Sequence, residues 1–307
     1  MGKASRTKVE VNRREKIAAQ RAAARRAEQR RRILIASGSI IAVVAVVLTF
    51  VLIKVNSHPS SSSASPASNG PTGSALTAVV DKVTSVPAST LDAVGDGGGA
   101  VTGKPATISG TALTANGKPE MLYMGAEYCP YCAAERWAMI VALSRFGTFS
   151  GLATTHSAVR NGAGVAEPDP NTPTWTFAHS SYSSPYLTFT PVELQTNIPD
   201  PSTGSYTTLQ TPTAAQQAVF THYDSSQGVP FIDFGNKYVI LGPSYDPGVL
   251  AGLTWSQVAT DLSNPNSAVA KAVDGTANYL TAAICKMTGN QPASACTATV
   301  QSLESQL

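Results

Sequence analysis

Cys129 and Cys132 are the residues of this sequence with the clearest chemical potential, because only Pro130 and Tyr131 separate them. Two thiols at this spacing can close a small disulfide ring and open it again. In such a pair one thiolate attacks a disulfide of another molecule, and the second thiolate resolves the mixed disulfide that forms. The spacing therefore predicts thiol–disulfide exchange, with Cys129 as the attacking residue and Cys132 as the resolving residue.

The two cysteines follow a predicted strand and begin a predicted helix. The run 121–125 is apolar at successive positions, as in a buried central strand, and residues 130–145 carry apolar side chains at near-helical spacing. The first turn of a helix offers unpaired N–H groups and a partial positive charge, which lower the pKa of a cysteine there. We therefore expect Cys129 to be the more exposed and more acidic thiol, with Cys132 shielded behind it.

Two other interpretations of the pair stay open. A tetrahedral zinc site needs four ligands with recognisable spacing. The remaining candidate ligands form no paired motif: Cys285, Cys296, His58, His156, His179 and His222. A purely structural bridge between Cys129 and Cys132 would close a tight loop that constrains little of the chain. The sequence predicts neither a metal nor a cofactor.

A second pair, Cys285 and Cys296, flanks the turn-forming stretch 289–292, Gly-Asn-Gln-Pro. An even number of cysteines outside a membrane favours disulfides, because that compartment is oxidising. We predict a structural disulfide here, which closes a loop of about a dozen residues and contributes roughly 3 kcal/mol in the chain-entropy account. The alternative is a second redox pair that relays electrons to Cys129 and Cys132.

The N-terminal region has the composition of a membrane anchor. Residues 1–32 contain 12 Lys or Arg against 3 Glu, and residues 33–53 form an apolar run without a formal charge. A helix of about 21 residues spans roughly the 30 Å hydrocarbon core of a bilayer. The run is therefore predicted to be a transmembrane helix in contact with membrane lipid. A cleavable signal peptide is the alternative, although its apolar region would be shorter, about 7–15 residues.

Charges flanking this run predict its orientation. Five arginines lie within residues 25–32 before the run, and only Lys54 directly follows it. By the positive-inside rule the N-terminus is cytoplasmic and the main domain is outside the cell membrane. An Arg-rich arm could instead bind nucleic acid. Its position beside the span favours an orientation signal in contact with anionic lipid, and no nucleic-acid partner is predicted.

The chain after the predicted transmembrane helix divides into three parts. Residues 54–74 are a flexible Ser/Pro-rich linker, 75–103 are an N-terminal extension with a short amphipathic helix, and 104–307 are the main domain. Within the domain, strands are predicted at 106–113, 120–126, 152–159, 174–180 and 186–194, with two more in 229–240 joined by a Gly-Asn turn. Helices are predicted at 130–145, 213–223 and 267–287.

A strand, then Cys-x-x-Cys, then a helix, and much later Gly228-Val229-Pro230 before another strand, resembles the thioredoxin superfamily. In that superfamily the active-site cysteines face a cis-proline, and the residue before the proline presents its backbone to substrate. The resemblance implies that Val229 and Pro230 bind substrate and that their peptide bond is cis. It also implies the fold class, which is α/β and thioredoxin-like, and this domain would follow the transmembrane helix predicted at 33–53.

A closer resemblance covers roughly residues 75–305. The stretches Tyr123–Trp137, Ala142–Gly147 and Ala282–Cys285 resemble the DUF929 family of uncharacterised thioredoxin-like membrane proteins. This resemblance implies a membrane setting and the same fold, with no established reaction. The chemistry therefore depends on the residues themselves.

Two departures from ordinary thioredoxins stand out. Residues 146–228 form a much longer connection than usual, so we expect an insertion that shapes a substrate groove or a partner surface, in addition to a helical C-terminal extension. The strand before the motif also lacks the buried aspartate that thioredoxins use for proton transfer. Glu127 and Glu135 lie nearby, and each is expected to be a surface charge, with a proton-handling role for Glu135 as the alternative.

These inferences together predict a membrane-anchored, extracytoplasmic thiol–disulfide oxidoreductase. Its expected partners are the thiols or disulfides of exported proteins and a membrane redox partner. The alternative, from a different functional class, is a non-catalytic thioredoxin-like binding or assembly module in which the cysteines form passive bridges.

Overall fold

A computed structural model describes residues 70–307. The predicted cytoplasmic segment, the transmembrane run 33–53 and most of the predicted linker lie outside the described residues. Within 70–307, no helix combines the length and the apolar character that crossing a membrane requires. The first helix, α2, spans Gly73–Thr84 and so begins inside the stretch predicted as linker.

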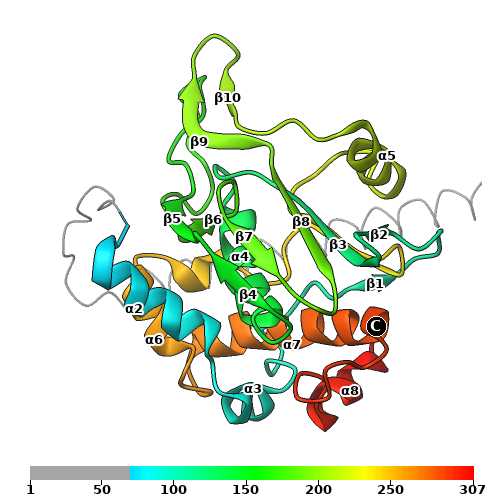
Figure 1. Cartoon of the computed structure of the whole chain (residues 1–307). Coiled ribbons are helices and arrows are strands. Elements are labelled where there is room, and N and C mark those ends of the chain that lie inside the picture. The colour runs from blue at the N-terminus through cyan, green and yellow to red at the C-terminus, as the bar shows by residue number, and fades with distance from the viewer. Residues whose placement is uncertain (1–69) are drawn as a thin grey trace, which may run out of the picture. The chain divides into compact units, whose positions relative to one another are not determined.

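A mixed sheet of six strands lies at the centre of the described chain (Figure 1). Its hydrogen-bonded order is β1, β12, β11, β3 and β2, with β8 paired to β3. Strands β3 and β8 run parallel, and the other pairs of this sheet are antiparallel. The strands are β1 (Ala106–Thr107), β2 (Thr114–Ala115), β3 (Lys118–Gly125), β8 (Thr188–Glu193), β11 (Phe231–Phe234) and β12 (Tyr238–Leu241).

Helices cover both faces of this sheet, which explains why β3 is apolar throughout. Met121 and Tyr123 belong to the larger buried cluster, which includes α4 (Pro130–Leu143) and α7 (Ala268–Thr288). Leu122 and Met124 point to the opposite face and pack with Phe220 of α5 (Ala214–Tyr223). Successive strand residues alternate between faces, so a strand with two covered faces needs apolar residues at every position.

The remaining helices pack around α7 and α4. Helix α2 contacts α6 (Trp255–Asp261), α3 (Ala88–Val94) contacts α7, and the short 3-10 turn η1 (Pro247–Leu250) lies against both α4 and α7. The chain ends in α8 (Ala298–Glu304), beside α7 (Figure 1). Val79, Val83 and Leu91 are buried in the larger cluster, so the extension 75–103 shares the hydrophobic core of the main domain.

The insertion between α4 and α5 adds three small two-stranded sheets. Strands β9 and β10 form the hairpin at the top of Figure 1. The strands of these sheets are β4 (Thr148–Ser150), β5 (Ala153–His156), β6 (Pro173–Thr176), β7 (Ser181–Ser183), β9 (Gln195–Asp200) and β10 (Ser205–Thr208). The predicted strands at 152–159 and 174–180 are therefore present but shorter than expected.

The strand predicted at 106–113 is also too long, because pairing with β12 ends at Thr107. Beyond it, the N–H of Ile108 still donates to the carbonyl of Lys237 at 2.9 Å, and the side chain of Asn236 donates to the carbonyl of Thr111. The predicted Asn116-Gly117 turn is confirmed, with both residues at positive φ (54° and 73°). These backbone angles suit asparagine and glycine, which is why the pair is a reliable turn signal.

Candidate active site

The cysteine pair lies at the start of α4, as predicted. Cys129 is the N-cap residue, and its sulfur accepts a hydrogen bond from the backbone N–H of Cys132 at 3.3 Å. Pro130 occupies the first helical position, where a missing N–H costs nothing and the fixed φ of proline suits the helix. The sequence Cys-Pro-x-Cys thus begins the helix and places the Cys129 sulfur over its first N–H groups.

The burial of the two thiols follows the expected order, but Cys129 is far less open than a surface nucleophile. Cys129 is 4% exposed and Cys132 is completely buried. Tyr128, Tyr131 and Val229 pack against the two cysteines and enclose them. Cys129 therefore presents only a small part of its surface to a substrate.

The two thiols also differ in acidity in the predicted direction. The hydrogen bond with Cys132 lowers the pKa of Cys129, burial opposes this shift, and backbone N–H groups and Arg136 lower the pKa further. Burial raises the pKa of Cys132 well above its ordinary value, and the neighbouring Cys129 raises it again. At neutral pH the first thiolate to form is therefore that of Cys129.

The turn before β11 lies against the attacking sulfur. The Val229–Pro230 peptide bond is cis, as predicted, and the thiol of Cys129 lies 3.7 Å from the carbonyl oxygen of Val229. Residues 129 and 229 are thus brought together from opposite ends of the insertion. Gln291–Pro292, in the loop between α7 and α8, is a second cis bond and was not anticipated.

The insertion forms one wall of the site. The ring of Tyr206, from β10, stacks on Tyr128 with centroids 4.2 Å apart and planes inclined by 8°. The hydroxyl of Tyr206 donates to Glu167 at 2.5 Å, and the N–H of Ala158 donates to the carbonyl of Tyr128 at 2.9 Å. No local pattern indicated a role for Tyr206 or Glu167, because both contacts depend on the folding of the insertion.

A buried ion pair lies behind the cysteines. Arg136 follows Cys132 by one helical turn, and its guanidinium donates to both carboxylate oxygens of Glu193, at the end of β8. Both side chains are completely buried. The i to i+4 spacing of Cys132 and Arg136 was a usable signal that the sequence analysis missed.

Glu135 is not the surface charge that the sequence predicted. It is completely buried, and its carboxylate accepts hydrogen bonds from the N–H and the hydroxyl of Ser244. Burial raises the pKa of Glu135 to about 7, while the bonds from Ser244 oppose the shift. Glu127, in contrast, is only half-buried.

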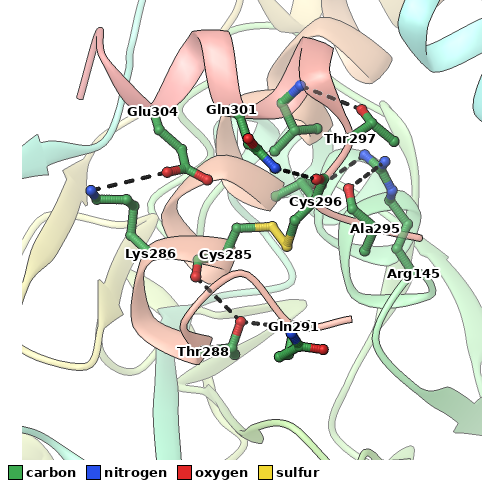
Figure 2. Close-up of a disulfide and its surroundings, with 12 residues drawn as sticks. Arg145, Cys285, Lys286, Thr288, Gln291, Ala295, Cys296, Thr297, Gln301 and Glu304 are labelled. Atoms are coloured by element: carbon green, nitrogen blue, oxygen red, sulfur yellow. Dashed lines mark hydrogen bonds and ion pairs between the residues drawn. A yellow bond between two sulfur atoms is a disulfide. The ribbon is translucent and has the colours of Figure 1, made fainter. Parts of the chain in front are cut away.

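The second cysteine pair forms the predicted disulfide. Cys285 and Cys296 are bonded, with Cα atoms 5.8 Å apart, and both are buried (Figure 2). Arg145 of the segment after α4 donates to the carbonyl of Ala295, and Gln301 of α8 donates to that of Cys296. The bond therefore fastens the end of α7 to the loop that leads into α8, inside a network of hydrogen bonds.

Among residues 70–307, no group of three or more His, Cys, Asp or Glu side chains is arranged to hold a metal ion. The thiol pair, the cis-proline turn and the buried ion pair are the features that can support chemistry. Together they define an α/β protein with a dithiol at the start of a helix.

Comparison with protein families places the chain in one family. The model for a domain of unknown function, DUF929, matches residues 104–286, and the chain belongs to this family. The match is narrower than the resemblance over 75–305 and includes Cys129, Cys132 and Cys285, but not Cys296. Comparisons with curated proteins and with solved structures gave no match.

Proposed function

We propose that this protein is a thiol–disulfide oxidoreductase of thioredoxin-like architecture that acts through Cys129 and Cys132. The single observation that carries the proposal is the position of the Cys129 sulfur. It accepts the N–H of Cys132 at the start of α4 and lies 3.7 Å from the Val229 carbonyl, beside a cis-proline. The N–H of Cys132 favours a thiolate, and the contact with Val229 places the sulfur next to a turn whose backbone can align a substrate.

In the proposed reaction the Cys129 thiolate attacks one sulfur of a substrate disulfide, and the other substrate sulfur leaves with the electron pair. The mixed disulfide is then attacked by the Cys132 thiolate. The substrate leaves reduced, and an enzyme disulfide forms between Cys129 and Cys132. The reverse sequence oxidises a substrate dithiol, and the geometry serves both directions.

The exposed apolar residues of the insertion favour a polypeptide substrate. Val159 and Val165 are 50% and 60% exposed on a short hairpin of the insertion that continues from Ala158, the residue bonded to Tyr128. Ile198, on β9, is a further exposed apolar residue at 60%. Exposed apolar side chains on the insertion suit the apolar segments of an unfolded or extended chain.

The proposed setting is the outer face of a membrane, with the domain tethered by residues 33–53 and acting on exported proteins. The buried Cys285–Cys296 disulfide supports this setting, since structural disulfides persist where the surroundings are oxidising. A membrane redox partner would restore the Cys129–Cys132 pair after each turnover.

A second candidate function is a binding or assembly module with no turnover. The observation that favours it is the burial of Cys129, which is only 4% exposed and is enclosed by two tyrosines and Val229. In this case the surface beside Val229 would hold a partner, and the thiols would not exchange.

Reduction of insulin by the full-length protein in detergent distinguishes the two functions. We expect the wild type to accelerate insulin reduction by a dithiol, and Cys129→Ser and Cys132→Ser each to lose this activity. Circular dichroism confirms that each variant folds. Equal rates for the wild type and both variants would exclude the oxidoreductase function and favour the binding module.

A further inference from the structure

Arg136 has one hydrogen-bonding group that nothing in the structure uses. Its Nε and Nη2 donate to Glu193 at 2.8 and 2.6 Å, and one oxygen of Glu193 also accepts the N–H of Phe177 at 3.3 Å. The Nη1 of Arg136 is buried and has no partner. Glu193 therefore holds the guanidinium through its Nε and Nη2 atoms, while the N–H groups of Nη1 have no acceptor.

Tyr123 has a second unused donor in the same region. Its side chain is completely buried, and its hydroxyl has no hydrogen-bond partner. The guanidinium of Arg136 lies 5.9 Å from the centre of its ring, on the opposite side of the strand from Leu122. Two unsatisfied buried donors in one place are unusual, because each costs about 1–3 kcal/mol when it is left unpaired.

Gly125 leaves room for the hydroxyl of Tyr123. Tyr123 and Gly125 lie on the same face of β3, and the phenol extends over the glycine, so that a Cβ at residue 125 would overlap the hydroxyl group. The ring therefore points along the strand toward its C-terminal end, where the chain turns into Cys129. The absence of a side chain at residue 125 is what allows this direction.

A thiolate on Cys132 raises the pKa of both Tyr123 and Arg136. Burial is the largest influence on the pKa of Tyr123, which it raises; Arg136 lowers this pKa, and a thiolate on Cys132 raises it more than one on Cys129 does. Arg136 also lowers the pKa of Cys132, against the larger effect of burial. Arg136 lies one helical turn after Cys132 on α4, so the two side chains project from the same face of the helix.

We propose that the hydroxyl of Tyr123 and the free Nη1 of Arg136 donate hydrogen bonds to the Cys132 thiolate as it forms in the resolving step, with Glu193 as the positioning residue that fixes Arg136. This inference rests on the proposed function and extends it to the second half of the reaction. Cys132 has no exposure to water, so its negative charge must be stabilised by groups of the protein. Neither donor has a partner in this structure, and a thiolate would be a stronger acceptor for them than the neutral thiol.

In the resolving step one sulfur–sulfur bond forms and another breaks. The thiol of Cys132 loses its proton, and the thiolate attacks the Cys129 sulfur of the mixed disulfide. The Cys129–Cys132 bond forms, the bond between Cys129 and the client breaks, and the client sulfur leaves with the electron pair. That client thiolate takes up the proton that Cys132 released. Tyr123 and Arg136 keep their own protons throughout, because they act as donors and not as acids.

The test uses the full-length reduced protein and dithiobis(nitrobenzoate), a symmetrical aromatic disulfide that releases a coloured thiol at each exchange. The first release reports attack by Cys129, and the second reports attack by Cys132 on the mixed disulfide. Tyr123→Phe removes only an unpartnered hydroxyl, so the fold is expected to persist. We expect the second release to slow about tenfold, the loss for one hydrogen bond to a charged group, with the first release little changed.

Three comparisons make the test specific. Arg136→Met combined with Glu193→Leu removes both ions together, which avoids leaving a lone buried charge, and should slow the second release more than Tyr123→Phe does. Tyr182→Phe is the control, because its hydroxyl donates to the carbonyl of Leu143 at 2.9 Å and should not affect the second release. The pH at which the rate of the second release reaches half its maximum should rise by about one unit in Tyr123→Phe.

A second measurement decides the question even if Cys129 resists the reagent, an outcome that would count against the proposed function. The pKa of Cys132 can be followed through the carbon-13 shift of its Cβ in selectively labelled, reduced protein. We expect a higher pKa in Tyr123→Phe than in the wild type. A pKa and a rate of second release that are unchanged in both Tyr123→Phe and the double variant would overturn the proposal.

Discussion

The sulfur of Cys129 accepts the backbone N–H of Cys132 at 3.3 Å, while the Cys132 side chain is completely enclosed. One residue of the pair therefore has its thiolate favoured by the helix start, and the other has its thiolate disfavoured by burial. This asymmetry underlies the division of the reaction into an attacking and a resolving cysteine. It also determines how each thiol should respond to reagents and to substitution.

The first prediction concerns topology. After mild reduction of intact cells, a membrane-impermeant thiol reagent should label the protein at Cys129, because the domain is expected to lie outside. Labelling should be slow, since the sulfur is only 4% exposed, and it should disappear in Cys129→Ser. Label that appears only after cell lysis would contradict the proposed orientation.

The second prediction separates a structural role for the Cys285–Cys296 disulfide from a redox relay. Replacing both cysteines with serine should lower the free energy of unfolding by roughly 3 kcal/mol, measured by urea denaturation. Insulin reduction at a temperature where the variant is folded should match the wild type. A variant that is folded but inactive would instead indicate that this pair passes electrons to Cys129 and Cys132.

The third prediction follows from a carboxyl group buried in α7. Asp274 is completely buried, both of its oxygens lack partners, and burial raises its pKa to about 8. A carboxyl whose pKa is higher in the folded state than in the unfolded state stabilises the fold fully only at low pH. Stability should therefore fall as the pH rises from about 4 to about 8, by up to ~1.4 kcal/mol per unit from this group.

Asp274→Asn tests this contribution because it keeps the shape of the side chain and removes the titration. We expect the variant to be more stable than the wild type at pH 8 and to lose less stability between pH 5 and pH 8, by urea denaturation. Asp81→Asn, at an exposed position of α2, is the matched control and should leave the slope unchanged. If the free energy of unfolding depends on pH in the same way in Asp274→Asn and in the wild type, Asp274 does not make this contribution.

How much of the site could be predicted depends on how local each signal is. The helix start at Cys129 and the turn at Asn116-Gly117 are specified by neighbouring residues, so the sequence was sufficient for both. Val229 was found through a family resemblance, because its contact with Cys129 spans 100 positions. The disulfide between Cys285 and Cys296 followed from cysteine number and spacing.

The features that escaped prediction depend on how distant segments pack. Arg136 and Glu193 are 57 positions apart and meet only because β8 lies beside β3. Glu135 was expected at the surface, since a charged residue in a helix usually faces water. It is buried because α4 has Ser244 on that side as a partner and is covered around nearly its whole circumference.

The last prediction concerns the separate roles of the two cysteines. Cys132→Ser keeps the attacking thiolate of Cys129 but removes the resolving thiol, so mixed disulfides with exported clients should accumulate. They should appear as high-mass bands on a non-reducing gel and disappear when a reductant is added. Cys129→Ser should give no such bands, because Cys132 is completely buried and burial raises its pKa well above the ordinary value.

The double variant Cys129→Ser/Cys132→Ser is the control for clients that bind without covalent exchange. The wild type should show few bands, because resolution by Cys132 is intramolecular and therefore outpaces the arrival of another thiol. Bands that form in Cys129→Ser but not in Cys132→Ser would reverse the two roles. That result would mean that α4 moves when a client binds, so that the sulfur enclosed in this structure becomes the one that meets substrate.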